Sequence, residues 1–228
     1  MSTSRSVRRE SVGVVAGTVR SDSDYTDDFR ALRDLRSDVT LVGLEIVLVH
    51  PEIPHNTGCA ARLAAGLGLR LHLVEPLGFS LEDRYLKRAG LDYWPLVDLV
   101  VHCSWSAASV ALGAGSERPF TERLRLFSAR GGRSLFETDF EADDVLVFGS
   151  ESRGLPARLL ADHEHRRVYV PIRSGVRSLN LANVTCLGVY TAMVRAGVPM
   201  PKNDGAYVAH PRAAEDVKPS SRVERIDA

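Results

Sequence analysis

Short apolar runs alternate with helix-like stretches over most of the sequence, and this alternation constrains the fold more than any other feature. Leu44–Val49 is a nearly continuous apolar run, as in a strand covered on both faces. The helix-like stretch Asn56–Leu67 separates it from the next expected strand, Arg70–Val74. Strands that alternate with helices predict an α/β domain with a parallel sheet. Further strands are expected at Leu96–His102, Leu124–Ser128, Val145–Phe148 and Val168–Val170, and further helices at Leu81–Ala89 and Asn180–Arg195.

The segments on either side of this alternating core are polar. Residues 1–24 are rich in Ser, Arg and Asp and are expected to be largely disordered. Residues 25–36 carry apolar side chains at helical spacing, which predicts a short helix that docks on the core or, alternatively, on RNA. We therefore predict an N-terminal extension over 1–40, one domain over 41–199 and a flexible tail over 200–228.

Composition limits the classes of function. The 228 residues include 29 positive and 29 negative side chains, so binding to phosphate needs a local basic patch. The cysteines number three, without CxxC spacing, which argues against a disulfide framework or a zinc site and favours a reducing compartment. No apolar run reaches the roughly 18 residues of a membrane span. We expect a cytoplasmic protein with no metal and no membrane partner.

A first polar cluster, His50–Gly58 followed by Arg62, lies at the expected end of the first strand. Open α/β folds bind their ligands at this edge of the sheet. Prolines flank Ile53 and stiffen the chain, after which Asn56 or Thr57 is expected to cap the helix. A helix N-terminus and an arginine together attract phosphate. The alternative is that Asn56 is only a cap and Arg62 only a surface cation.

A second cluster, Phe148–Pro156, follows a later expected strand. Its two glycines bracket a polar segment that contains Glu151 and Arg153, and glycine permits positive φ or close approach of the backbone. Glu151 and Arg153 either face a ligand or pair with each other. The alternative is a tight turn with a solvated glutamate.

A third polar segment, Val170–Asn180, precedes the longest expected helix. Its backbone amides and carbonyls can bind an adenine or a carboxylate, while Ser178 or Asn180 caps the helix. The helix, Asn180–Arg195, is apolar on more than one face, which predicts burial on more than one face. The second face forms a subunit interface or, alternatively, packs within a monomer.

These segments resemble the motifs of the SPOUT methyltransferases of the TrmH type, and most of all the small enzymes of that family that methylate the tRNA wobble nucleotide. The resemblance covers about Leu44 to Val198. It is carried by Glu52–Gly58 with Arg62, Arg70–Phe79, Arg88–Tyr93, Phe148–Pro156 and Arg177–Leu181. The sequence departs from the family pattern in three places: His50 replaces a usual acidic residue, Ser152 replaces a usual threonine, and Ser174-Gly175-Val176 differs from the usual loop.

The resemblance implies a Rossmann-like parallel sheet with a C-terminal deep trefoil knot, an obligate homodimer, and S-adenosylmethionine as the methyl donor. The residues that match the family's cofactor pocket are Ala129, Gly149, Val170, Ser178 and Leu179. Those that match its functional polar positions are Asn56, Arg62, Glu151, Ser178 and Asn180.

The implied reaction is attack of a tRNA ribose 2′-hydroxyl on the activated methyl group, which requires positioning and removal of a proton. Arg62 is either the general base or, because a guanidinium keeps its proton, the group that binds phosphate and orients the hydroxyl. The cations expected to bind tRNA are Arg84, Lys87, Arg88, Arg153 and Arg177.

Other functions remain as alternatives. The same fold could methylate ribosomal RNA or another tRNA position, or the chain could be an RNA-binding module without catalysis. A nicotinamide-dependent oxidoreductase is disfavoured, because Gly66-Leu67-Gly68 lacks the third glycine of the dinucleotide motif.

Overall fold

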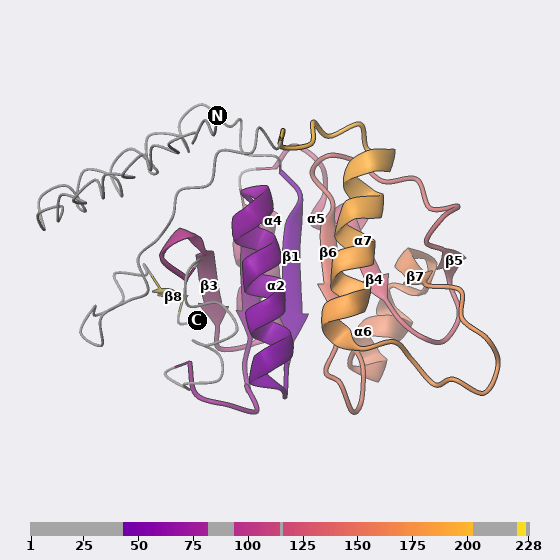
Figure 1. Ribbon diagram of the computed structural model, residues 1–228, viewed down its shortest axis with the longest axis horizontal. Helices are drawn as coiled ribbons and strands as arrows, with labels where there is room; N and C mark the ends of the chain where they lie inside the picture. Colours follow the sequence, from indigo (N-terminus) through magenta and orange to yellow (C-terminus); the bar gives the residue numbers. More distant parts are fainter. Residues whose placement is uncertain (1–42, 82–93, 115, 203–222, 227–228) are drawn as a thin grey trace, which may run out of the picture. The chain divides into compact units, whose positions relative to one another are not determined.

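The computed structural model describes residues 43–81, 94–114, 116–202 and 223–226, and it has the predicted α/β architecture (Figure 1). The strands are β1 (Glu45–Val49), β2 (Arg70–Val74), β3 (Asp98–His102), β4 (Leu124–Phe127), β5 (Arg133–Ser134), β6 (Val145–Phe148), β7 (Arg167–Tyr169) and β8 (Val223–Ile226). The helices are α2 (Pro54–Leu67), α4 (Trp105–Gly113), α5 (Phe120–Arg123), α6 (Ala157–Asp162) and α7 (Leu181–Arg195), with 3-10 turns η1 (Trp94–Leu96) and η2 (Glu164–Arg166).

The strands form one sheet in the order β5-β7-β4-β6-β1-β2-β3-β8, and the recorded pairs are all parallel. The chain runs outward from β1 through β2 to β3, and then returns to the opposite side of β1 to add β4 and β6. Because the strands are parallel, the loops that leave their carboxyl ends meet at a single edge. The predicted parallel sheet is therefore confirmed.

Helices α2 and α7 cover one face of the sheet (Figure 1). Alternate residues of the central strands point into this layer, including Ile46 and Leu48 of β1 and Leu71 of β2, all of them buried. The facing side of α2 is built from small residues such as Ala61 and Ala64, which allow the helix to lie close to the sheet.

The opposite face carries α4, α5 and α6. Here Val47 and Val49 of β1 pack with Leu112 of α4 and Leu159 of α6. Successive residues of β1 thus belong to two different cores, as expected for a strand with side chains that alternate between two covered faces. This explains the unbroken apolar run in the sequence.

Helix α7 approaches the sheet through a glycine. A Cβ atom at Gly188 would lie 2.7 Å from the Phe127 ring, and Phe127 stacks on Phe148 with ring centroids 4.3 Å apart. Any side chain at Gly188 would therefore displace the aromatic pair. This contact holds α7 against β4 and β6.

The start of α2 corrects one prediction. The helix begins at Pro54, with Ile53 as its N-cap residue and no side-chain cap, so neither Asn56 nor Thr57 caps it. Proline is well suited to the first helical position, because its missing N–H would have no partner there. Asn56 lies inside the first turn and is buried, which leaves its amide available for other contacts.

Several elements differ from the sequence expectations. Helix α4 and strand β5 were not expected, and β8 lies within the stretch expected to be a tail. The expected helices at 25–36 and Leu81–Ala89 lie outside the described residues, apart from Leu81 itself. Among the described helices, none has the length and apolar character needed to cross a bilayer.

Candidate active site

The candidate site lies where the chain leaves β1 and β6, two adjacent strands of the sheet. The loop after β1 leads to α2 on one face, whereas the loop after β6 leads to α6 on the other. Two neighbouring loops that diverge to opposite faces form a topological switch point at the carboxyl edge, which we call the crevice because open α/β sheets bind their ligands there. The first two polar clusters of the sequence are these loops.

The loop after β6 is a tight turn that presents three polar side chains. Ser150 and Gly154 exchange backbone hydrogen bonds of 3.2 and 2.9 Å, and Gly154 has a φ of +72°. A Cβ atom at Gly149 would lie 2.1 Å from the Gly154 carbonyl carbon, so the turn requires glycine there. The turn therefore exposes Glu151, Ser152 and Arg153 at the crevice.

Glu151 reaches across the crevice to the start of α2. Its carboxylate accepts hydrogen bonds from the Glu52 amide at 2.8 Å, the Ile53 amide at 3.2 Å and Asn56 Nδ2 at 2.9 Å. The negative charge lies at a helix N-terminus that has no side-chain cap of its own, where it is favoured by the helix dipole. Glu151 thus binds the N-cap amide and the amide before it, whereas no side chain caps the first-turn amides of α2.

Asn56 continues the network to α7. Its Oδ1 accepts a hydrogen bond of 3.0 Å from Asn180 Nδ2, and Asn180 Oδ1 in turn caps α7 by accepting from the amides of Ala182 and Asn183. The predicted cap at Asn180 is confirmed. The structure therefore joins three of the predicted polar residues, Glu151, Asn56 and Asn180, although 124 residues separate the last two.

Arg62 lies elsewhere on α2. It is exposed six residues beyond Asn56, and it lines a groove between α2 and α7 together with Cys59, Asn183 and Cys186. A guanidinium in a groove beside the α7 N-terminus is suited to binding an anion. The first turn of α2 and this groove are therefore two neighbouring parts of the candidate site.

The residues predicted to bind a cofactor lie in loops that leave three adjacent strands. Ala129 follows β4, Gly149 follows β6, and Val170 follows β7. Ser178 and Leu179 are exposed in the segment 171–180, which leads from β7 to α7. Within residues 171–179, all of them described, the single recorded backbone hydrogen bond joins the Val176 amide to the Arg173 carbonyl. Most polar backbone groups of this loop are thus available to a ligand.

The residues predicted to bind RNA divide into two groups. Arg153 and Arg177 are exposed in the loops after β6 and β7, at the edge that carries the rest of the site. In the described part of the chain, no carboxylate lies within ion-pair distance of either side chain. Arg84, Lys87 and Arg88 lie outside the described residues.

Sequence reasoning missed the role of Glu52 and Ser152. Glu52 accepts hydrogen bonds from Ser152 Oγ at 2.6 Å and from the Ser152 amide at 3.1 Å. The Ser152 hydroxyl is the main reason that the pKa of Glu52 lies below its usual value; partial burial opposes this, while the Ser152 amide and the Arg153 charge add to it. An acidic residue three positions after a strand was the available signal, but its partner 100 residues away was not predictable.

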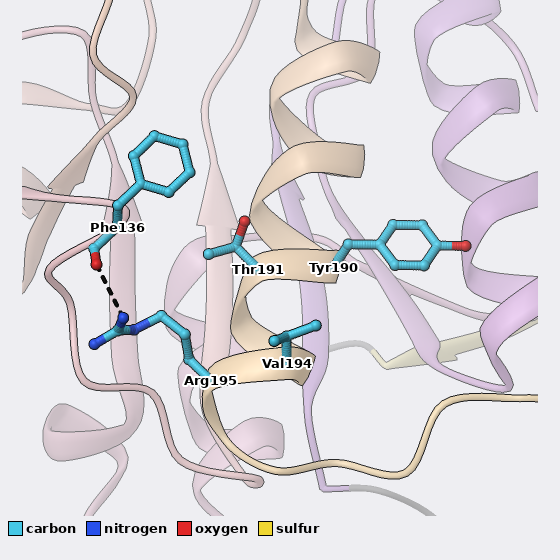
Figure 2. Close-up of a pocket in the computed structure, with 5 residues that line it drawn as sticks. All are labelled: Phe136, Tyr190, Thr191, Val194 and Arg195. Carbon is cyan, nitrogen blue, oxygen red and sulfur yellow. Dashed lines mark hydrogen bonds between the residues drawn. The ribbon is translucent and has the colours of Figure 1, made fainter.

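A second pocket lies on the outer side of α7 (Figure 2). Phe136, Tyr190 and Val194 line it and are exposed to 54%, 44% and 67%. Arg195 fixes the loop that carries Phe136, because its guanidinium donates to the Phe136 carbonyl at 2.9 Å and to the Thr138 carbonyl at 2.6 Å. Three large apolar side chains are thus held at the surface of one helix and its neighbouring loop.

Comparison with known proteins gives one family. Residues 43–190 match the model of the SpoU rRNA Methylase family. A tRNA (cytidine(34)-2′-O)-methyltransferase of Burkholderia ambifaria is 45% identical over 67% of this chain and 95% of its own length. The enzyme of that name from Polaromonas sp. is 43% identical over 75% of this chain and 97% of its own length. A solved structure, from work on 2-OH methylation of C/U34 on tRNA, is 48% identical over 68% of this chain and 96% of that one, with a TM-score of 0.61.

Proposed function

The chain belongs to the SpoU rRNA methylase family, and from that premise we propose that it methylates the 2′-hydroxyl of a tRNA ribose at the wobble nucleotide, position 34, with S-adenosylmethionine as donor. The observation that carries the proposal is the network Glu151–Asn56–Asn180, which joins three of the family's functional polar positions at one edge of the sheet. Relatives named for methylation at cytidine 34 match over nearly their whole length, which supports the choice of tRNA and of position.

The residues at the carboxyl edge fit S-adenosylmethionine. An adenine and an amino acid group need hydrogen-bonding backbone and apolar contact, and segment 171–179 offers mainly unpaired amides and carbonyls beside the exposed Ile172, Val176 and Leu179. We assign the cofactor to Ala129, Gly149, Val170, Ser178 and Leu179. When bound, the cofactor supplies a methyl group already activated on a sulfonium.

The protein's own residues then have to bind and orient the RNA. A guanidinium keeps its proton at neutral pH, so we assign Arg62 to the phosphate next to the target ribose rather than to proton removal. Ser178 lies two residues before the α7 cap, where its hydroxyl can hydrogen-bond the target 2′-hydroxyl. The network of Asn56, Glu151 and Asn180 ties the start of α2 to the start of α7. It therefore positions both Arg62 and Ser178.

The exposed arginines at the same edge supply the phosphate contacts. Arg153 and Arg177 are joined there by Arg130 and Arg173, whereas Arg133 is already paired with Asp139 at 2.8 Å. A local group of unpaired cations lets a protein of zero net charge bind a polyanion. A target base in an anticodon loop is unpaired, which suits recognition of single-stranded RNA.

We further propose the homodimer and the deep knot of the family for this chain. The exposed apolar face formed by Phe136, Tyr190 and Val194, next to the groove between α2 and α7, supports a self-association surface. The return of α7 across the sheet to pack on β6 and α2 supports a chain that passes back through its own C-terminal loops.

Methyl transfer from labelled S-adenosylmethionine to tRNA that lacks its natural 2′-O-methyl groups tests the proposal. We expect label at ribose 34 after nucleotide mapping. Label at another tRNA position or on ribosomal RNA would contradict the substrate, while absence of label despite measured cofactor binding would contradict the reaction itself.

A further inference from the structure

Two adjacent crevice loops are tied by a reciprocal pair of glutamates. Glu151, in the loop after β6, accepts from the Glu52 and Ile53 amides, and Glu52, in the loop after β1, accepts from the Ser152 amide and hydroxyl. Each carboxylate thus satisfies backbone donors of the other loop. We call this arrangement, Glu52 and Ser152 with Glu151, the glutamate brace.

The loop after β2 fixes the backbone of Glu52 from the other side. The Gly78 amide donates to the Pro51 carbonyl at 2.9 Å, and a Cβ atom at Gly78 would lie 2.7 Å from Glu52 Cα. Glu52 therefore lies between the loops after β2 and β6, with no room to shift toward Gly78. This fixed backbone places the Glu52 side chain beside Ser152.

The brace is connected to the rest of the site by a short path. Ser152 is the residue next to Glu151, so the Glu52 carboxylate fixes the peptide from which the Glu151 side chain extends. Glu151 in turn holds Asn56, and Asn56 holds Asn180 at the start of α7. A shift of Ser152 would therefore also shift Asn56 and Asn180, the two residues that orient α2 and α7.

We propose that Glu52 and Ser152 are positioning residues for methyl transfer, acting through Glu151 on Asn56 and Asn180. This inference rests on the proposed function, and it adds two residues to which the proposed function assigns no role. Neither residue lines the groove that contains Arg62, so we expect the effect to fall mainly on alignment in the bound complex. Misplacement of reacting groups by about 1 Å costs roughly 100-fold in rate.

The lowered pKa of Glu52 agrees with this role. The Ser152 hydroxyl favours the charged carboxylate most, burial opposes it, and the Ser152 amide and the nearby Arg153 add to the lowering of the pKa. Glu52 is therefore ionised at the pH of any methyl transfer assay, and the charged form is the better acceptor. Replacement by glutamine removes the charge while it keeps the size.

The test compares Glu52→Gln, Ser152→Ala and Ser152→Thr with the unaltered protein by steady-state methyl transfer to unmodified tRNA. We expect Glu52→Gln and Ser152→Ala to lower kcat about 10- to 100-fold, with KM for both substrates within about twofold. Ser152→Thr retains the hydroxyl and should keep nearly full kcat. The double variant should be no slower than the worse single variant, since both changes break the same brace.

The matched control is Glu137→Gln, the same change at an exposed glutamate away from the crevice, which should leave kcat and KM unchanged. Unaltered kcat in Ser152→Ala would overturn the inference, even if Glu52→Gln failed to fold. So would a rise in KM with constant kcat, or equal losses in Ser152→Ala and Ser152→Thr. An inactive unaltered protein would contradict the proposed function instead, which keeps the two failures distinct.

Discussion

Asn56 is the residue on which the candidate site depends most directly. The residue is 3% exposed, and its amide donates to Glu151 and accepts from Asn180, so both ends of the side chain are used. An amide suits this position, because its nitrogen donates to the carboxylate while its oxygen accepts from Asn180. This explains why a buried asparagine occupies the first turn of α2.

Asn56→Asp should therefore destabilise the protein by about 2 kcal/mol or more, since it places a second carboxylate against Glu151 in a buried position. We expect denaturant unfolding to show the loss, and the double variant Asn56→Asp with Glu151→Gln to recover about 1 kcal/mol, because the glutamine amide can donate to the new carboxylate. Asn183→Asp, the same change at an exposed position of α7, is the control and should not destabilise. Equal stability of the single and double variants would contradict the direct contact.

At the level of elements, three polar side chains from β1, β2 and β3 form a hydrogen-bonded row on the face of the sheet that α4 covers. The Glu45 carboxylate accepts from His72 Nε2, and His72 Nδ1 lies 2.8 Å from His102 Nε2 with the two rings stacked. Burial lowers the pKa of His102 to about 4, with the charge of His72 acting in the same direction and that of Glu45 opposing. Burial alone would raise the pKa of Glu45, but His72, Arg70 and Arg123 hold it below its usual value.

These pKa values predict acid sensitivity. His102 has a pKa of about 4 in the folded protein and about 6.5 in the unfolded chain, so the unfolded chain binds more protons between these values. The free energy of unfolding should therefore fall as the pH drops from about 6.5 to 4, by about 2 to 3 kcal/mol. Denaturant titrations at several pH values measure it, and His102→Asn should flatten the profile above pH 4.5, where Glu45 does not yet contribute. The same slope in both proteins would contradict the assignment.

The elements also show how far the sequence predicts this fold. Strand β2 has its predicted bounds, and α7 begins one residue later than predicted. Both elements were predictable because apolar patterning and flanking caps are local signals. Helix α4 was missed because its alanines and serines give little periodicity, and β5 because two residues carry no pattern. The sequence predicts that Glu151, Asn56 and Asn180 lie at the same edge of the sheet. It does not predict that they form hydrogen bonds with one another. Contacts such as His72 with His102 depend on strand register, which no single segment encodes.

For the whole molecule, the proposed homodimer makes a mass prediction. The protein should sediment at about twice its chain mass of 25.0 kDa, and Val194→Asp should shift it toward the monomer, since a charge there opposes burial of the apolar face on α7. Val194 is 67% exposed, so the change should leave the fold intact. The control is Val110→Asp on α4, a residue 74% exposed on the opposite face of the sheet. Monomers in the unaltered protein, or equal dissociation in both variants, would contradict the assigned surface.

The position of β1 in the sheet has a consequence for synthesis of the protein. β1 pairs on one side with β2, which follows soon after it, but on the other side with β6, which the ribosome delivers about 100 residues later. Until then a nascent sheet of β1, β2 and β3 has an unpaired apolar edge at Glu45–Leu48, and such edges recruit other chains. A chain that ends before Val145 should therefore aggregate rather than fold as a smaller domain.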